Sequence, residues 1–186
     1  MKFARYMITD RRAVGGLEAL IKLARCRMAE GISAIQIREK DLDASELYQL
    51  TKAIVALPNP AGTRVLVNGR LDVALAAGAD GVHLPAGSPE PRMIRALCPA
   101  DFLIGISCHD SREIAMAQEA DYVLLAPIFK PVSKRDERTP LGLNTLAESV
   151  RASRVPIVAL GGISRERIDD CIAAGAAGVA GISLFL

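Results

Sequence analysis

The chain has 186 residues, 51% of them hydrophobic, and a mean hydropathy of +0.25, so a large apolar core is available to one domain. Its formal net charge of +2, from 23 basic and 21 acidic residues, argues against binding nucleic acid through a broad basic face. No apolar run is long enough to cross a membrane, and the first residues do not form a signal-peptide pattern.

The four cysteines lie far apart and form no C-x-x-C motif, which is typical of free thiols in a reducing compartment. We also see no linker, no low-complexity tract and no shift in composition along the chain. The sequence therefore predicts one cytoplasmic domain over residues 1–186.

One short phrase recurs four times along the chain. A small residue that ends a helix is followed by a brief Ala, Ser or Asp link and then by an apolar run, starting near Gly31, Gly78, Glu119 and Gly175. A helix that ends in this way and leads into a buried strand is the αβ joint of a parallel α/β protein. Each interval between these joints holds one further apolar run of strand length.

In chain order, the pattern predicts eight strands: Phe3–Ile8, Ala34–Ile37, Arg64–Val67, Gly81–Leu84, Phe102–Ile106, Tyr122–Leu125, Val155–Leu160 and Gly178–Gly181. The predicted helices are Leu17–Glu30, Ala44–Leu57, Leu71–Ala77, Pro89–Leu97, Ser111–Glu119, Leu143–Ala152 and Arg165–Ala174. Eight βα units predict a compact (β/α)8 TIM barrel. Because the sequence stops soon after the last strand, we expect the eighth helix to be short or missing.

The carboxyl ends of the strands form the active-site face of such a barrel, so the residues after each strand are the candidates for chemistry. Gly161 and Gly162 follow the seventh strand, and Ile182 and Ser183 follow the eighth. Loops at these two places often bind phosphate through backbone N–H groups. We expect a phosphate site here; the alternative is a purely structural turn.

Alternating residues Gln36, Arg38 and Lys40 share one side of an extended segment at the end of the second strand. If that side is the barrel mouth, two cations face the substrate and imply a carboxylate or pyrophosphate. His109 follows the fifth strand and is the candidate general base, although a capping or packing role is the alternative. His83 lies within a strand, where we expect a buried structural histidine.

The long connection from Pro127 to Gly142 carries Lys134 and follows a strand's carboxyl end, so we expect a lid or binding loop rather than a plain surface loop. The carboxylates near the mouth are few, and no close pair stands out as a Mg²⁺ site. These candidates are Asp10, Glu39, Glu90 and Asp110.

The motifs in this chain resemble those of the thiamine phosphate synthase/TenI superfamily along nearly the whole length. The matching blocks, in order, are Ile35–Lys40 (Q-x-R-x-K), Val67–Ala74 (V-N-D-R-x-D-x-A), Gly81–Leu84 (G-V-H-L), Ile104–His109 (I-G-x-S-x-H), Ala120–Val123, Gly161–Ile163 and Gly178–Ala180. Seven blocks in the right order are specific for the superfamily, which implies a TIM barrel acting in thiamine biosynthesis.

Two departures from the motifs bear on the choice of branch. Thiamine phosphate synthases carry Mg²⁺-binding aspartates in V-N-D-R and in H-L-G-Q-x-D, but here Gly69 replaces the first and residues 85–89 contain no aspartate. The stretch Leu84–Ser88 is instead similar to the TenI branch, the thiazole tautomerases. This similarity implies an isomerase that converts a dihydrothiazole carboxylate phosphate to its aromatic tautomer, with no metal or organic cofactor.

The resemblance also implies roles for single residues. His109 would move the proton, Arg38 and Lys40 would orient the substrate carboxylate with Asn68 nearby, and Gly162 and Ser183 would help to hold the phosphate. Lys134 corresponds loosely to a pyrophosphate-binding lysine of the synthases. The expected partner is a small phosphorylated thiazole, with no nucleic acid and no membrane.

Two other functions stay open at this point. The first is a thiamine phosphate synthase that joins aminopyrimidine pyrophosphate to thiazole phosphate, which would require Mg²⁺ with altered ligands such as Glu90. The second is a non-catalytic binder or regulator of phosphorylated ligands on the same barrel. A homodimer is a further expectation, because a neighbouring copy could cover strands that lack an eighth helix.

Overall fold

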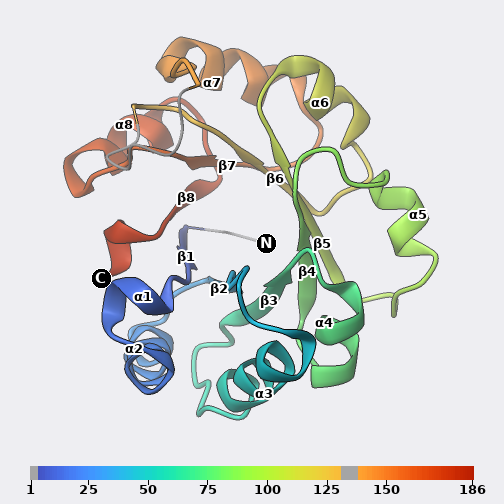
Figure 1. Cartoon of the computed structure of the whole chain (residues 1–186). Coiled ribbons are helices and arrows are strands. Elements are labelled where there is room, and N and C mark those ends of the chain that lie inside the picture. Colours follow the sequence, from blue (N-terminus) through green and yellow to red (C-terminus); the bar gives the residue numbers. More distant parts are fainter. Residues whose placement is uncertain (1–3, 131–137) are drawn as a thin grey trace.

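The computed structural model describes residues 4–130 and 138–186. Eight parallel strands form a closed barrel in sequential order, and each strand pairs with the next until β8 pairs with β1 (Figure 1). The strands are β1 Arg5–Ile8, β2 Ala34–Ile37, β3 Arg64–Asn68, β4 Gly81–Leu84, β5 Leu103–Cys108, β6 Tyr122–Leu125, β7 Ile157–Leu160 and β8 Gly178–Gly181. The predicted TIM barrel is confirmed.

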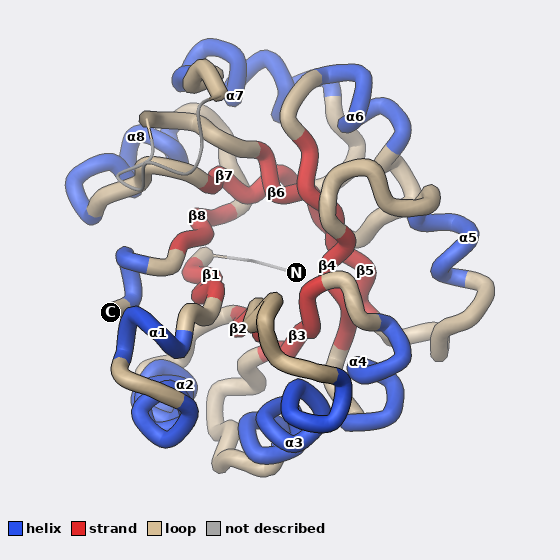
Figure 2. Tube along the Cα trace, viewed as in Figure 1, coloured by secondary structure: helices blue, strands red, loops and turns tan. Residues whose placement is uncertain are grey.

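Helices form a ring around the strands (Figure 2). They are α1 Arg11–Val14, α2 Leu17–Ala29, α3 Ala44–Val55, α4 Leu71–Ala77, α5 Pro91–Arg95, α6 Ser111–Met116, α7 Gly142–Ala152 and α8 Ile168–Ala173, with 3₁₀ turns η1 Arg165–Arg167 and η2 Ser183–Phe185. Helix α8 follows β7. Within the described part of the chain, only the 3₁₀ turn η2 follows β8, and this agrees with the prediction that the helix after the last strand is short or missing. No described helix is long and apolar enough to span a bilayer.

The short helix α1 is not in the sequence prediction. Asp10 is extended and its carboxylate accepts hydrogen bonds from the backbone N–H groups of Arg12 and Ala13, which caps this single turn. Asp10 therefore serves the backbone of α1 as an N-cap. Gly15 ends the turn in a left-handed conformation, with φ of 92°.

Two predicted boundaries move because of proline. The helix predicted from Pro89 begins at Pro91, since the residue before a proline is disfavoured in helical conformation and Glu90 is extended with ψ of 141°. Strand β7 begins at Ile157 rather than Val155, because Pro156 has no N–H to donate to the sheet.

Two apolar clusters hold the barrel together. The larger packs the outer faces of the strands against the helices, and it includes Ile35, Val67, Ile104 and Cys108. The smaller fills the barrel and includes Tyr6, Leu66, Tyr122 and Leu124. Because all strands are parallel, their carboxyl ends meet at one rim, which we call the mouth, and the interior cluster lies beneath it.

Candidate active site

A chain of hydrogen bonds runs across the barrel interior below the mouth. We call it the interior polar chain; its members are Asn68, Gln36, Tyr6, Tyr122, His83 and Ser107. Asn68 Nδ2 donates to Gln36 Oε1 (3.2 Å), and Gln36 Nε2 donates to the Tyr6 hydroxyl (2.9 Å). Both end members, Asn68 and Ser107, are half-buried.

The other half of the interior polar chain joins two tyrosines to a histidine. The Tyr6 and Tyr122 hydroxyl oxygens are 2.7 Å apart. His83 Nδ1 is 3.2 Å from the Tyr122 hydroxyl, and His83 Nε2 is 2.8 Å from Ser107 Oγ. The buried structural role predicted for His83 agrees with this position, where its side chain is almost fully enclosed.

The interior polar chain is uncharged. Burial, and secondarily the nearby charge of Arg38, lowers the pKa of His83 to about 3. Burial likewise raises the pKa of both Tyr6 and Tyr122 well above that of a free phenol. The floor of the mouth therefore offers neutral hydrogen-bonding groups to a ligand near neutral pH.

Sequence reasoning missed both tyrosines. The sequence pattern places Tyr6 and Tyr122 only as residues of apolar strands, and their hydroxyl groups meet because β1 and β6 face each other across the closed barrel. Their position within predicted strands was the only available signal.

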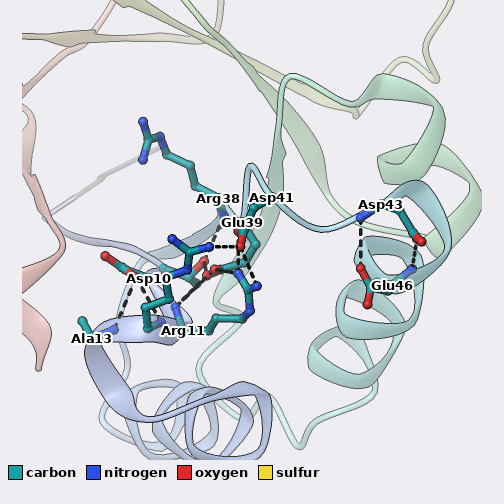
Figure 3. A network of polar contacts seen from close by, with 10 residues as sticks. Asp10, Arg11, Ala13, Arg38, Glu39, Asp41, Asp43 and Glu46 are labelled. Carbon is teal, nitrogen blue, oxygen red and sulfur yellow. Dashed lines mark hydrogen bonds and ion pairs between the residues drawn. The ribbon is translucent and has the colours of Figure 1, made fainter.

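Arg38 extends over the barrel opening, away from the acidic side chains of its own loop (Figure 3). Its backbone N–H donates to Thr9 Oγ1 (2.9 Å), which fixes the start of the β2 loop. Lys40 is exposed two residues further along. Gln36 and Arg38 thus share the inner side, as the alternation predicts, and Asn68 bonds to Gln36 directly.

His109 lies at the rim between β5 and β6. Its Nδ1 is 2.7 Å from the carbonyl oxygen of Ala126, so Nδ1–H donates to that carbonyl, and its backbone N–H donates to Glu113 (2.6 Å). Arg138 Nη1 lies 2.5 Å from His109 Nε2, which places a guanidinium at the ring nitrogen that would have to act as base. Both ring nitrogens are therefore engaged.

The glycines after β7 pack against the loop after β6. A side chain at Gly161 would meet Pro127 at 2.8 Å, and one at Gly162 would meet the Lys130 carbonyl oxygen at 2.5 Å. Phe129 N–H donates to the Gly161 carbonyl (3.0 Å). This contact supports a structural role for the two glycines in a tight turn. It does not engage the N–H group of Gly162, so an anion-binding role is still possible in geometric terms.

The anion-binding reading rests on backbone N–H groups. Among residues 4–130 and 138–186, the N–H groups of Gly162 and Ser183 have no hydrogen-bond acceptor. Ile182 packs at the top of the interior cluster, directly before Ser183. Donors at the ends of β7 and β8 are thus available to a phosphate at the place that the sequence indicates.

The carboxylates near the mouth are already engaged. Glu39 is buried and accepts hydrogen bonds from Thr9 Oγ1 (2.6 Å) and from the backbone and side chain of Arg11. Asp41 accepts two hydrogen bonds from Arg11 and one from Arg12 (Figure 3), and this pairing holds the pKa of its carboxyl far below its usual range.

The remaining acidic candidates are engaged in the same way. Asp110 accepts from the N–H of Glu113 at the start of α6 (2.8 Å), and Glu90 pairs with Arg92 (2.7 Å). Within the described residues, no three His, Cys, Asp or Glu side chains gather in a way that could hold a metal ion. The described part of this rim therefore does not offer a donor set that fits a Mg²⁺ site.

A pocket of about 310 Å³ opens between the loops after β2 and β3. Its polar lining includes Glu39, Lys40, Asn68 and Arg70, and Gly69 contributes bare backbone. Lys134 and its immediate neighbours, predicted as a lid, lie outside the described residues.

A family model and several similar proteins place the chain in one family. A family model described as thiamine monophosphate synthase matches residues 5–185. A protein from Methanoregula boonei named thiamine-phosphate synthase is 42% identical over 98% of this chain and 85% of its own length. A protein of the same name from Methanoculleus marisnigri is 42% identical over 98% of this chain and 87% of its own length.

A solved structure described as thiamine phosphate pyrophosphorylase from Pyrococcus furiosus is also similar. It superposes with a TM-score of 0.84 and is 30% identical, covering 97% of this chain and 86% of its own. The similarity in sequence and the similarity in fold therefore extend over nearly the same length of chain.

These findings overturn the isomerase interpretation. Relatives at about 40% identity over nearly the full length are named synthases, so the tautomerase function and the isomerase class inferred from the sequence are wrong. Two missing aspartates do not outweigh similarity that extends along nearly the whole chain. The geometry gives a physical reason as well, because the His109 nitrogen needed as base faces the guanidinium of Arg138.

Proposed function

Because the chain belongs to the thiamine monophosphate synthase family, we propose that it joins aminopyrimidine pyrophosphate to thiazole phosphate, forming thiamine phosphate and releasing pyrophosphate. The observation that supports this proposal is that two groups of hydrogen-bond donors suited to anions lie on one rim. One is the pair of loops after β7 and β8, and the other is the pocket between the loops after β2 and β3.

The two places suit two substrates. In the closed strand order β3 lies across the barrel from β7, so a phosphate on one side and a pyrophosphate on the other would bring their rings toward the centre of the mouth (Figure 1). The interior polar chain lies below, and its neutral end groups at Asn68 and Ser107 can pair with the donors and acceptors of an aminopyrimidine.

The chemistry needs no acid or base from the protein. The ring nitrogen of the thiazole attacks the methylene carbon of the pyrimidine substrate, the carbon–oxygen bond to pyrophosphate breaks, and its electron pair leaves on the pyrophosphate oxygen. A positive charge develops on the thiazole nitrogen and an additional negative charge on the leaving group. The protein's part is to bring the two rings together and to stabilise the leaving charge.

The family resemblance implies Mg²⁺-binding aspartates at two motif positions, and the residues of this chain do not fit that role. Gly69 occupies one position, and Pro85, Ala86, Gly87 and Ser88 follow β4 where the other is expected. Among residues 4–130 and 138–186, the carboxylates near the mouth already accept hydrogen bonds from arginines and backbone N–H groups. We therefore route no step through a metal ion.

The proposal also includes the roles that the sequence indicates for residues at the mouth. We propose that Arg38 and Lys40 face the anionic substrate, that Gly161, Gly162, Ile182 and Ser183 form the phosphate site, and that Lys134 belongs to a lid. A cytoplasmic location, a single domain and a homodimer likewise stay predictions. The proton-transfer role of His109 falls with the isomerase, because the coupling reaction moves no proton in its bond-forming step.

The test is to incubate the purified protein with aminopyrimidine pyrophosphate and thiazole phosphate and to measure thiamine phosphate and pyrophosphate together. We expect both products in equal amounts, and neither when one substrate is omitted. Binding of both substrates without turnover, with or without added Mg²⁺, would favour the non-catalytic binder and refute the proposal.

A further inference from the structure

The pocket between the loops after β2 and β3 has the chemistry of an anion site. Its volume of about 310 Å³ is at the small end of ligand pockets. Lys40 and Arg70 are its two cations and Asn68 adds an amide. The backbone of Gly69 borders the same space without a side chain.

The one carboxylate in the lining does not cancel these cations. Glu39 is directed to the β1 side, where Thr9 Oγ1 and the backbone N–H and guanidinium of Arg11 donate to it. Only 3% of the Glu39 side chain is exposed to solvent. Its charge is thus balanced outside the pocket, and the pocket keeps a cationic lining.

Arg70 is held in place by an ion pair that leaves part of its guanidinium available. Asp72 accepts from Arg70 Nε (2.9 Å) and from Nη2 (2.6 Å), which fixes the plane of the guanidinium. Within the described residues, Nη1 has no such partner and remains available to a ligand. A guanidinium held by one carboxylate can still donate to a phosphate oxygen through its remaining N–H groups.

Gly69 explains what the pocket lacks. The family resemblance implies an aspartate here that binds Mg²⁺, and a Cβ at this position would contact only the Pro85 ring, at 3.6 Å. Space for the side chain is therefore present while the carboxylate is absent. Because position 69 carries no carboxylate, a phosphate group that contacts Lys40 and Arg70 is not repelled by an unpaired negative charge at that position.

We propose that this pocket binds the pyrophosphate of the pyrimidine substrate directly through Lys40 and Arg70, so that no divalent metal ion is required. This inference rests on the proposed function. When the carbon–oxygen bond breaks, the electron pair and the additional negative charge stay on the pyrophosphate oxygen, and the two cations of the pocket stabilise that charge. The positive charge left on the thiazole nitrogen balances it, and no further reactant is needed.

The first test measures binding rather than turnover. Isothermal titration of the full chain with sodium pyrophosphate in the presence of EDTA should give a Kd within about threefold of that measured with MgCl₂. Loss of binding in EDTA would overturn the inference.

Matched variants locate the binding. Arg70→Gln and Lys40→Gln should each weaken pyrophosphate binding by roughly ten- to a hundredfold, the usual effect of losing a hydrogen bond to a charged group. Arg64→Gln is the control, because Arg64 begins the same strand at the opposite end of the barrel and also pairs with an aspartate, Asp80 (2.8 Å). Equal weakening in the control would overturn the assignment.

A second variant reverses the predicted behaviour. Gly69→Asp restores a carboxylate at a left-handed position, with φ of 70°, which aspartate tolerates better than most residues. This variant should bind pyrophosphate more weakly than the unsubstituted chain in EDTA and regain affinity with Mg²⁺. The absence of any difference between the two proteins would count against a metal-free pocket.

Turnover distinguishes failure of this inference from failure of the proposed function. Coupling of the two substrates in EDTA supports both. Coupling only with added Mg²⁺ overturns the inference and leaves the synthase function standing. Absence of coupling under either condition refutes the synthase function, even where pyrophosphate binds to the pocket.

Discussion

His83 Nε2 lies 2.8 Å from the hydroxyl oxygen of Ser107, and this contact joins the enclosed interior of the barrel to its mouth. The imidazole is neutral near neutral pH because burial and Arg38 lower its pKa to about 3. The site thus has an uncharged floor below a rim that carries the charge.

The pKa of His83 makes stability depend on pH. The folded pKa lies below the unfolded value of 6.5, so the unfolded chain binds the proton first as pH falls. The free energy of unfolding should be fully retained above about pH 6.5 and should fall as pH drops toward about 3. Urea unfolding at about pH 7.5 and about pH 5 measures this loss.

A substitution tests whether His83 is the group responsible. His83→Gln should reduce the loss of stability between the two pH values. An undiminished loss in His83→Gln would show that this imidazole is not the group responsible.

Removing one phenol hydroxyl should weaken the interior polar chain. Tyr122→Phe takes away the partner of both Tyr6 and His83, so buried polar groups lose a hydrogen bond. We expect a loss of about 1–3 kcal/mol in the free energy of unfolding. Tyr48→Phe, on the half-buried face of α3, should cost much less, and equal losses would contradict the assigned role.

Glu39 should matter more to stability than an exposed acid. Glu39→Gln places an amide opposite donors from Thr9 and Arg11, and we expect a loss of about 2–4 kcal/mol. Glu90→Gln, which breaks an exposed pair with Arg92, should cost about 1 kcal/mol or less. Chemical denaturation of the two variants makes the comparison, and a neutral Glu39→Gln would refute it.

Gly162→Ala should disturb the loops of the proposed phosphate site. Its Cβ would come within 2.5 Å of the Lys130 carbonyl, so the loop after β6 must move. Gly78→Ala is the matched control, since Gly78 is also left-handed, with φ of 71°, but has nothing within 4 Å. The control should lose about 1–2 kcal/mol of stability and keep its affinity for thiazole phosphate, whereas Gly162→Ala should lose both.

His109 should be dispensable for bond formation. Because coupling moves no proton in its bond-forming step, His109→Gln should retain turnover to within about tenfold, and the pH profile of kcat should keep its shape. A loss of about 10³-fold or a new pH dependence would show that the imidazole takes part in proton transfer after all.

The barrel could be predicted from the sequence because its signals are local. Glycines such as Gly78 end helices directly before buried strands, and this repeated joint, together with the apolar runs between the joints, is enough to count the strands. The boundaries at Pro91 and Ile157 were less accurate, since they depend on which backbone groups a proline removes.

The site was only partly predictable. Positions at strand ends, such as Arg38 and Gly162, follow from counting strands, whereas the contact of Tyr6 with Tyr122 depends on closure of the barrel across 116 residues of sequence. The choice of reaction failed for a different reason. Gly69 stands where the family motif has an aspartate. The absence of that carboxylate does not by itself indicate which reaction the remaining cations support.

The most direct test of the central claim is a single assay of the purified chain with both substrates, in which thiamine phosphate and pyrophosphate are quantified by mass spectrometry. The synthase account predicts one pyrophosphate released for each thiamine phosphate formed. It is contradicted if the aminopyrimidine pyrophosphate and thiazole phosphate are both recovered unchanged from protein that binds them.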